Sequence, residues 1–343
     1  MKRTTLIAPI LLVTTALAHA QTIPVTVDNF VRAESDSYMG TLAKQAGALG
    51  KIFHHREPAP IDDQSIIRLN RDTLYSFAVV DLDAGPVTVT LPDAGGRFMS
   101  LMSVSQDHYA TTVYGKGEHV FSRDKIGTRY ALIGVRTFAD PNDPADVEKV
   151  HALQDKIKLA QKETGKLDLP SWDKASQKKV HDALLVLGST ITSFDHAFGT
   201  KSEVDPIRHL IGAAAGWGGN PDRDAKYLNI MPAKNDGTTV YQLKVKNVPV
   251  DAFWSVSVYN ADGFYTKNPY NAYSLNSVTA KKDSDGTVAI QFGGCDGKIP
   301  NCLPIVKDWN CTVRLYRPRQ DILSGKWKFP EPQPVNTVGS ATK

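Results

Sequence analysis

Hydrophobic and polar positions alternate over two long stretches of the chain. Within residues 66–137, the runs 73–80, 87–91 and 98–104 are strand-like, and turn-forming Asp, Gly and Pro residues separate them. The same pattern returns from Tyr241 onward, where Asp-Gly dipeptides stand beside apolar runs and favour hairpins. Short strands at this spacing predict two β units of the sandwich or barrel type.

Apolar residues at helical spacing mark two other stretches. Residues 27–52 predict one helix near the start of the chain. Within residues 140–200, Asp143-Pro144 is a typical helix start, and a second helix is expected after Ser171. The apolar positions are Val147, Val150, Leu153, Ile157 and Ala160 in the first of these helices, and Val180, Leu184, Leu187, Ile191 and Phe194 in the second.

These patterns predict a mainly β chain with a helical insert, of the α+β class. Two antiparallel β units, sandwich or jelly-roll-like, are joined by a helical connector. The chain of 343 residues is long enough for two substantial cores. We expect the first β unit with its leading helix at 21–139, the connector at 140–200, the second β unit at 201–330 and a flexible tail at 331–343.

The first 20 residues have the three parts of a secretory signal peptide. Lys2 and Arg3 are followed by an apolar run and then by Ala18-His19-Ala20, the small-x-small pattern at which such peptides are cleaved. The apolar run is shorter than the roughly 20 residues of a membrane span. We therefore expect cleavage after Ala20, a periplasmic or secreted product, and no integral membrane segment.

Composition and charge narrow the class of protein. Hydrophobic residues make up 41% and charged residues 22% of the chain, which is typical of a globular protein and not of a disordered or fibrous one. The formal net charge of +4 is too small to indicate a nucleic-acid partner. The sequence contains no phosphate-binding loop, Gly-x-Ser-x-Gly or His-Glu-x-x-His motif, and we predict neither a cofactor nor a metal.

Three cysteines lie near the C-terminus, at positions 295, 302 and 311. An oxidising compartment permits disulfides, and the Gly and Pro residues between Cys295 and Cys302 can bend the chain enough to join them. We favour this pairing over others, although spacing does not fix connectivity. A zinc site is the weaker interpretation, because no Cys-x-x-Cys or His-x-x-x-His pair accompanies the cysteines.

A cluster of polar residues opens the first β unit, at residues 68–76. Asn70, Asp72 and Tyr75 are candidates for a polar pocket at a sheet end, with Arg97 as a further member. The alternative is structural: Asn70 and Asp72 cap a turn, and Asp72 pairs with an arginine. We favour this alternative for the segment.

Asp107 and His108 stand side by side after a strand. An aspartate can hold an imidazole as a general base, and this pair is a candidate for acid–base catalysis. Neighbouring residues of a strand point in opposite directions, so the two side chains need a loop to act together.

The second β unit carries an aromatic window and an arginine cluster. Residues 253–273 hold seven aromatics, Tyr259 and Tyr265 among them, that either pack in the core or line a pocket wall, and Asn260 is a polar candidate beside them. Arg317 follows the last clear strand, where a guanidinium can bind a carboxylate or phosphate. For the arginines of residues 314–319, the alternative is pairing with a structural carboxylate such as Asp251 or Asp321, and we favour it.

Several segments together resemble two bacterial families of unknown function. In the first half these are Arg-Leu-Asn-Arg-Asp-Thr-Leu-Tyr-Ser (68–76), Asp-Leu-Asp-Ala-Gly-Pro-Val (81–87) and residues 91–98, which resemble domain-of-unknown-function family 1254. In the second half they are residues 216–221, 251–260, 273–276 and 314–319, which resemble family 1214. The resemblance implies a two-domain, mainly β architecture with a helical insert. It supplies no activity and therefore no catalytic residue.

Three hypotheses about function follow. The first is a small molecule or glycan bound in a cleft between the β units, by Asn70, Asp72, Tyr75 and Arg97 from the first unit and Tyr259, Asn260, Tyr265 and Arg317 from the second. The second is a hydrolase or lyase that uses Asp72 or Asp107 with His108 as acid and base. The third is a structural or assembly role, in which copies of the chain form a homo-oligomer.

Overall fold

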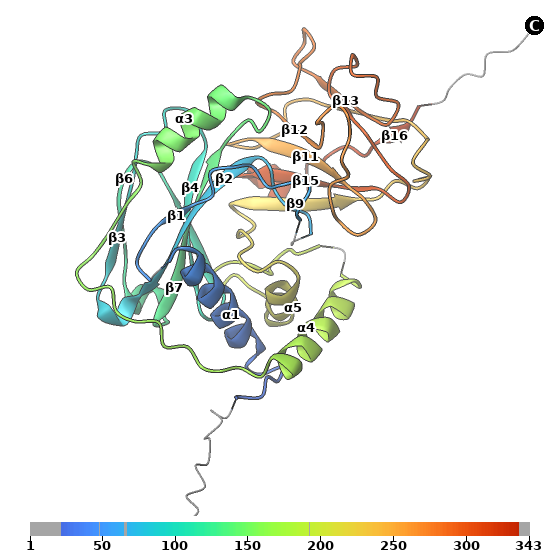
Figure 1. The fold of residues 1–343 in the computed structure, drawn as a ribbon. Coiled ribbons are helices and arrows are strands. Elements are labelled where there is room, and N and C mark those ends of the chain that lie inside the picture. The colour runs from blue at the N-terminus through green and yellow to red at the C-terminus, as the bar shows by residue number, and fades with distance from the viewer. Residues whose placement is uncertain (1–21, 48, 65–66, 192, 336–343) are drawn as a thin grey trace, which may run out of the picture.

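The structure, a computed structural model, describes residues 22–335 except for positions 48, 65–66 and 192. The predicted signal peptide at 1–20 lies outside this part of the chain. Figure 1 shows one β unit built from the first half of the chain and a second from its last third, with helices packed beside and between them. The β-rich α+β fold predicted from the sequence is confirmed.

The first β unit is a pair of sheets packed face to face. Val80, Leu101 and Ile133 from one sheet meet Val87 and Val89 from the other in a shared core. The larger sheet has the strand order β1 (Phe53–His54), β2 (Thr73–Asp81), β7 (Tyr130–Phe138), β4 (Met99–Ser105) and β5 (Ala110–Tyr114). The smaller has β6 (Gly117–Phe121), β3 (Val87–Leu91) and β8 (Lys158–Gln161), and the short helices η1 (Leu82–Ala84) and α2 (Arg123–Ile126) fill connections.

The helix predicted after Asp143 is shorter than the apolar spacing indicated. Asp143 caps helix α3 (Pro144–Gln154), as its Pro at the first turn predicts. The helix then ends, and β8 pairs antiparallel with β3. Ile157 is buried in the sandwich core from a turn, not from a helix. The helical connector predicted at 140–200 therefore includes a strand where helical spacing was expected to continue through Ala160.

The second β unit is also a sandwich of two four-stranded sheets. Leu243 and Ile290 from one sheet pack against Val256 and Val313 from the other. One sheet has the order β14 (Cys302–Leu303), β13 (Val288–Phe292), β10 (Tyr241–Val245) and β16 (Gln333–Pro334). The other has β12 (Ser274–Asn276), β11 (Trp254–Tyr259), β15 (Asn310–Tyr316) and β9 (Ala225–Ile230), and helix α6 (Gln320–Leu323) follows β15.

Two sequence predictions about this unit have clear outcomes. Cys295 and Cys302 form the predicted disulfide, and Cys311 is a free, buried thiol on β15. Of the tail predicted at 331–343, residues 333–334 form a strand that pairs with β10, and positions 336–343 lie outside the described residues. A short edge strand therefore lies within the Pro-rich segment for which a flexible tail is predicted.

Three helices pack against one another, and the first of them, α1, also packs against the larger sheet of the first unit. They are α1 (Phe30–Gln45), α4 (Lys174–Gly188) and α5 (Pro206–Ala215), and Asp173 and Asp205 cap the last two. Met39 and Ala43 of α1 join Phe77 and Val79 of β2 in one cluster. Among the described residues, no helix is both long enough and apolar enough to cross a membrane.

The strands β11 and β15 are buried on both faces, and this places the candidate site. Their apolar residues enter the sandwich core, whereas Ser255, Ser257, Tyr259, Thr312 and Arg314 are also buried. These polar residues lie on the opposite face, which packs against the segment leading into β2. The polar face of one β unit is therefore an interface with the other unit and not a solvent-exposed surface.

Candidate functional site

Arg314 is the centre of the buried interface between the two β units. Its guanidinium donates to Ser257 Oγ at 2.9 Å, to the Tyr259 hydroxyl at 2.8 Å and to the Arg68 carbonyl at 2.8 Å. The Tyr259 and Tyr265 hydroxyls both donate to the Leu69 carbonyl, at 2.8 and 2.7 Å. Arg314, Tyr259 and Tyr265 are thus used to hold residues 68–69 against the second sandwich.

Asp72 belongs to the same buried network. Ser255 Oγ donates to Asp72 Oδ2 at 2.5 Å, and the other carboxylate oxygen has no hydrogen-bond partner. Burial raises the pKa of Asp72, although the nearby Arg314 and the Ser255 hydrogen bond counteract this rise. The partner of Asp72 is a serine from the second unit, which the sequence did not indicate.

Asn70 joins the two units through its amide. Asn70 Nδ2 lies 2.9 Å from the Tyr316 hydroxyl and 3.2 Å from the Tyr75 hydroxyl, while Asn70 Oδ1 accepts from the Asp72 amide at 2.7 Å. Asn70, Asp72 and Tyr75 therefore lie close together, as the pocket hypothesis requires. The bond to the Asp72 amide also shows the turn that the structural alternative describes.

The Asn260 side chain stabilises a turn. Its side-chain oxygen accepts from the backbone amides of Asp262 and Phe264, at 3.1 and 2.9 Å. Both bonds stabilise the turn at the end of β11, which is the usual function of an Asn beside Asp-Gly.

Asp107 and His108 do not form the predicted acid–base pair. The Asp107 carboxylate pairs with Arg32 of α1. The His108 ring is buried, its Nε2 accepts from the Gly218 amide at 2.8 Å, and its Nδ1 has no hydrogen-bond partner. Burial lowers the pKa of His108 to about 3, so the ring is neutral at pH 7. The sequence placed the two residues together, but a positive φ of 62° at His108 turns its side chain toward a different partner.

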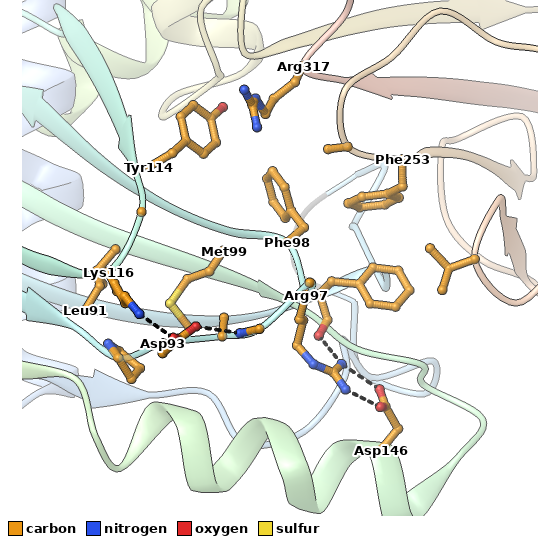
Figure 2. A pocket seen from close by; sticks show the side chains of 18 of the residues that line it. Leu91, Asp93, Arg97, Phe98, Met99, Tyr114, Lys116, Asp146, Phe253 and Arg317 are labelled. Atoms are coloured by element: carbon orange, nitrogen blue, oxygen red, sulfur yellow. Dashed lines mark hydrogen bonds and ion pairs between the residues drawn. The ribbon is translucent and has the colours of Figure 1, made fainter.

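A cleft lies between the two β units and is shown in Figure 2. It has a volume of about 700 Å³. The first unit contributes the loop 92–98 before β4 together with Tyr114 and Lys116, and the second contributes residues 251–253 and Arg317. Of the eight residues assigned to a cleft by the sequence, Arg97 and Arg317 line this one.

Aromatic rings form the middle of the cleft. The Phe98 ring packs 5.4 Å from Phe253 and 6.2 Å from Tyr114, measured between centroids. Figure 2 shows Arg317 and Tyr114 at one end, with Phe98 and Phe253 between them and the Arg97–Asp146 pair. The cleft therefore combines an apolar wall with charged groups at its two ends.

Most charges in the cleft already have partners. Arg97 forms a two-point ion pair with Asp146 and also donates to the Phe138 carbonyl at 2.8 Å. This pairing lowers the pKa of Asp146. Lys116 pairs with Asp93 at 2.6 Å. Within the arginine cluster at 314–319, the predicted pairing with a structural carboxylate is found for Arg319, which pairs with Asp251 at 2.6 Å, and not for Arg317.

Arg317 is the cation of the cleft that pairs with no carboxylate among the described residues. Its backbone is held on both sides, because its amide donates to Asp224 O and its carbonyl accepts from the Asp251 amide, both at 2.8 Å. Its φ of 52° is uncommon for a residue with a side chain, and such conformations concentrate at functional sites. The guanidinium lies 4.8 Å from the centroid of the Tyr114 ring.

The opposite end of the cleft is acidic. Asp140 and Asp143 line it, and their carboxylates accept from backbone amides at the start of α3 without a cation partner among the described residues. In total, three cations and five carboxylates line the cleft. No group of three or more potential metal ligands occurs within the described part of the chain.

Sequence reasoning missed the Tyr114 and Phe98 positions of the cleft. Both side chains lie at strand ends, where the alternating pattern predicts only which face a residue occupies. Phe98 could have been predicted from the sequence, because it follows the Gly95-Gly96 turn and a large aromatic residue beside a loop is a candidate for a pocket wall.

Comparisons with known proteins agree with the predicted families. Residues 49–161 match a family described as a protein of unknown function, DUF1254, and residues 231–320 match another with the same description, DUF1214. Among curated proteins, none matches the chain.

Two solved structures share the fold. The VPA0106 protein from Vibrio parahaemolyticus is 19% identical, with a TM-score of 0.68 over 90% of this chain and 97% of that one. An uncharacterised protein from Burkholderia cenocepacia is 16% identical, with a TM-score of 0.52 over 90% of this chain and 86% of that one. At these identities the likeness shows the fold.

Proposed function

We propose that this protein, which carries a DUF1254 region followed by a DUF1214 region, binds a small polyhydroxy acid, such as an acidic sugar, in the cleft between its two β units. The observation that carries the proposal is Arg317. Its guanidinium lies in the cleft without a carboxylate partner among the described residues, on a backbone held in an uncommon conformation.

The ligand class follows from the arrangement of charges and rings. A guanidinium binds a carboxylate through two parallel hydrogen bonds, which suits the acid group of the ligand. At the other end, Asp140 and Asp143 offer acceptors for hydroxyl groups, whereas a second anionic group would be repelled there. Between them, the Phe98 ring offers an apolar surface against which a sugar ring can pack.

The volume of the cleft and its place support the same proposal. Small-molecule sites commonly occupy about 300–1,000 Å³ and lie between domains. The cleft of about 700 Å³ is within this range. The hydrolase or lyase hypothesis has less support, because His108 is buried on the Gly218 loop and pairs with neither Asp72 nor Asp107.

We propose further that the protein acts outside the cytoplasm. The signal-peptide pattern at residues 1–20 and the disulfide between Cys295 and Cys302 both support an oxidising compartment.

A titration of the protein with glucuronate tests the binding proposal. We expect glucuronate to raise the thermal midpoint of unfolding and glucose to raise it less, because a ligand that binds only the native state stabilises that state. The variant Arg317→Asn removes the guanidinium and keeps a residue that tolerates a positive φ, and it should lose the glucuronate effect. The exposed Lys162→Ala is the matched control. An equal response of Arg317→Asn and the unchanged protein would contradict the proposal.

A further inference from the structure

A second polar hollow lies over the middle of β7. This strand is flanked by β2 and β4, and its residues are buried except for Gly134 and Arg136, which are half-buried. Tyr75, the register partner of Arg136 on β2, is likewise the one half-buried residue of its strand. Three adjacent positions of a covered sheet therefore keep partial access to water.

Gly134 leaves space on the same face as Arg136, since residues two apart on a strand share a face. A Cβ at Gly134 would approach no atom closer than the Met102 carbonyl oxygen, at 4.0 Å. The elements that cover the sheet, including helix α1 and the loop at Gly218, therefore do not fill the space above this glycine.

Arg136 enters the hollow without a charged partner among the described residues. Its Nη2 donates to the Gly218 carbonyl at 3.0 Å, its Nη1 contacts Met102 Sδ at 3.7 Å, and its guanidinium lies 5.5 Å from the Tyr75 ring centroid. No carboxylate pairs with it among the described residues. A guanidinium has five N–H donors, and a cation withdrawn from water is costly without an anion beside it.

Two hydroxyl groups lie beside this cation. Ser100 is the register partner of Arg136 on β4, and its buried Oγ has no hydrogen-bond partner. The Tyr75 hydroxyl is held by Asn70 Nδ2 at 3.2 Å. Burial would raise the pKa of Tyr75, but Arg136 and the hydrogen bond from Asn70 outweigh burial and lower it, so the phenol is a strong donor.

We propose that the hollow over Gly134 and Arg136 binds a carboxylate group, with the Arg136 guanidinium and the Ser100 and Tyr75 hydroxyls as donors. A planar carboxylate matches the guanidinium fork, and its two oxygens can also accept from the hydroxyls. This site is separate from the cleft at Arg317, and it does not depend on the function proposed for that cleft.

The site is tested with acetate as the probe, against chloride at the same ionic strength. We expect acetate to raise the thermal midpoint of unfolding and to bind at least tenfold more weakly to Arg136→Gln. The variant Gly134→Val keeps the charge and fills the hollow with a side chain that suits a strand, and it should also lose acetate binding. Arg317→Asn should keep acetate binding, and the other two variants are compared in the Arg317→Asn background, because the cleft is itself proposed to bind a carboxylate.

Three results would overturn the proposal. One is equal stabilisation by acetate and chloride, and a second is stabilisation by inorganic phosphate but not by acetate. The third is unchanged acetate binding in Gly134→Val. This result overturns the proposal even if Arg136→Gln fails to fold. Far-ultraviolet circular dichroism establishes that Gly134→Val is folded.

Discussion

Ser255 Oγ donates a hydrogen bond of 2.5 Å to Asp72 Oδ2, and 183 residues separate the two in the sequence. Ser255 lies on β11 of the second sandwich, and Asp72 immediately precedes β2 of the first. The bond therefore crosses the interface between the two β units, where both residues are fully buried. It ties the polar face of one sandwich to the first strand of the other.

We expect Asp72 and Ser255 to be coupled in stability. Ser255→Ala leaves a buried carboxylate without its donor and should lower the free energy of unfolding by about 1–3 kcal/mol. Asp72→Ala leaves Arg314 buried without an opposite charge and should cost about 3–5 kcal/mol. Urea denaturation of the double variant should show a loss smaller than the sum of the two. Strict additivity would mean that the bond contributes nothing.

We expect His108 to make the protein sensitive to mild acid. The pKa of His108 is lowered by burial from 6.5 to about 3, so between these values the unfolded chain binds a proton that the folded protein does not. The stabilising contribution of the neutral ring is complete above pH 6.5 and decreases as the pH falls toward 3.

The comparison with His108→Asn isolates this contribution, because Asn tolerates the positive φ. Between pH 6 and 4, the wild type should lose about 1.4 kcal/mol per pH unit relative to the variant. Urea denaturation at several pH values measures this difference. A difference that stays constant from pH 7 to pH 4 would show that His108 does not titrate differently on unfolding.

The two arginines of the cleft should have opposite effects. Arg97 is paired with Asp146, and both side chains are largely buried, so Arg97→Gln should lower the free energy of unfolding by about 1–3 kcal/mol. It should change glucuronate affinity little. Arg317→Asn should do the reverse, because Arg317 has no ion-pair partner among the described residues. Calorimetric titration and urea denaturation of both variants distinguish the roles, and a loss of glucuronate affinity confined to Arg97→Gln would reverse the assignment.

The thiol of Cys311 should be unreactive in the folded protein. The residue is fully buried, and burial raises the pKa of its thiol to about 12, which leaves almost no thiolate at pH 8. A thiol reagent should therefore label no cysteine in the native protein and one after unfolding without reductant. Labelling of three cysteines under the second condition would show that Cys295 and Cys302 are not joined.

The mature protein should begin at Gln21. The pattern at residues 18–20 is the cleavage signal on which this expectation rests. Expression of the full sequence in a bacterium with a periplasm, followed by N-terminal sequencing of the product, measures the cleavage position. An uncleaved product that stays with the cytoplasmic fraction would contradict both the export and the compartment that we propose.

The two β units could be predicted from the sequence because their cores are local patterns. Leu243 and Val245, or Val87 and Val89, alternate with exposed or half-buried neighbours, and this period of two is a property of any strand with one buried face. The Cys295–Cys302 bond was predictable for a similar reason, since a short loop between the two cysteines limits how far apart they can lie.

The candidate site was less predictable. Asn70 and Tyr75 could be placed together because they are five residues apart, but the partners Ser255, Arg314 and Tyr316 come from distant strands. Arg97 and Arg317 look equivalent in the sequence. Their difference depends on whether an aspartate lies within reach, and Asp146 reaches Arg97 only because α3 packs beside the loop before β4.

The sequence by itself predicted most of the core strands and their turns, the disulfide and the two families whose models the regions match. Only the tertiary structure decided that the polar faces of β11 and β15 are buried against the first β unit, and that Arg97 has an aspartate within reach whereas Arg317 has none among the described residues. The physical reason is that the alternation of apolar and polar residues shows only which face of its own sheet each residue occupies. Burial and charge pairing depend instead on a second surface, which the chain supplies more than a hundred residues away.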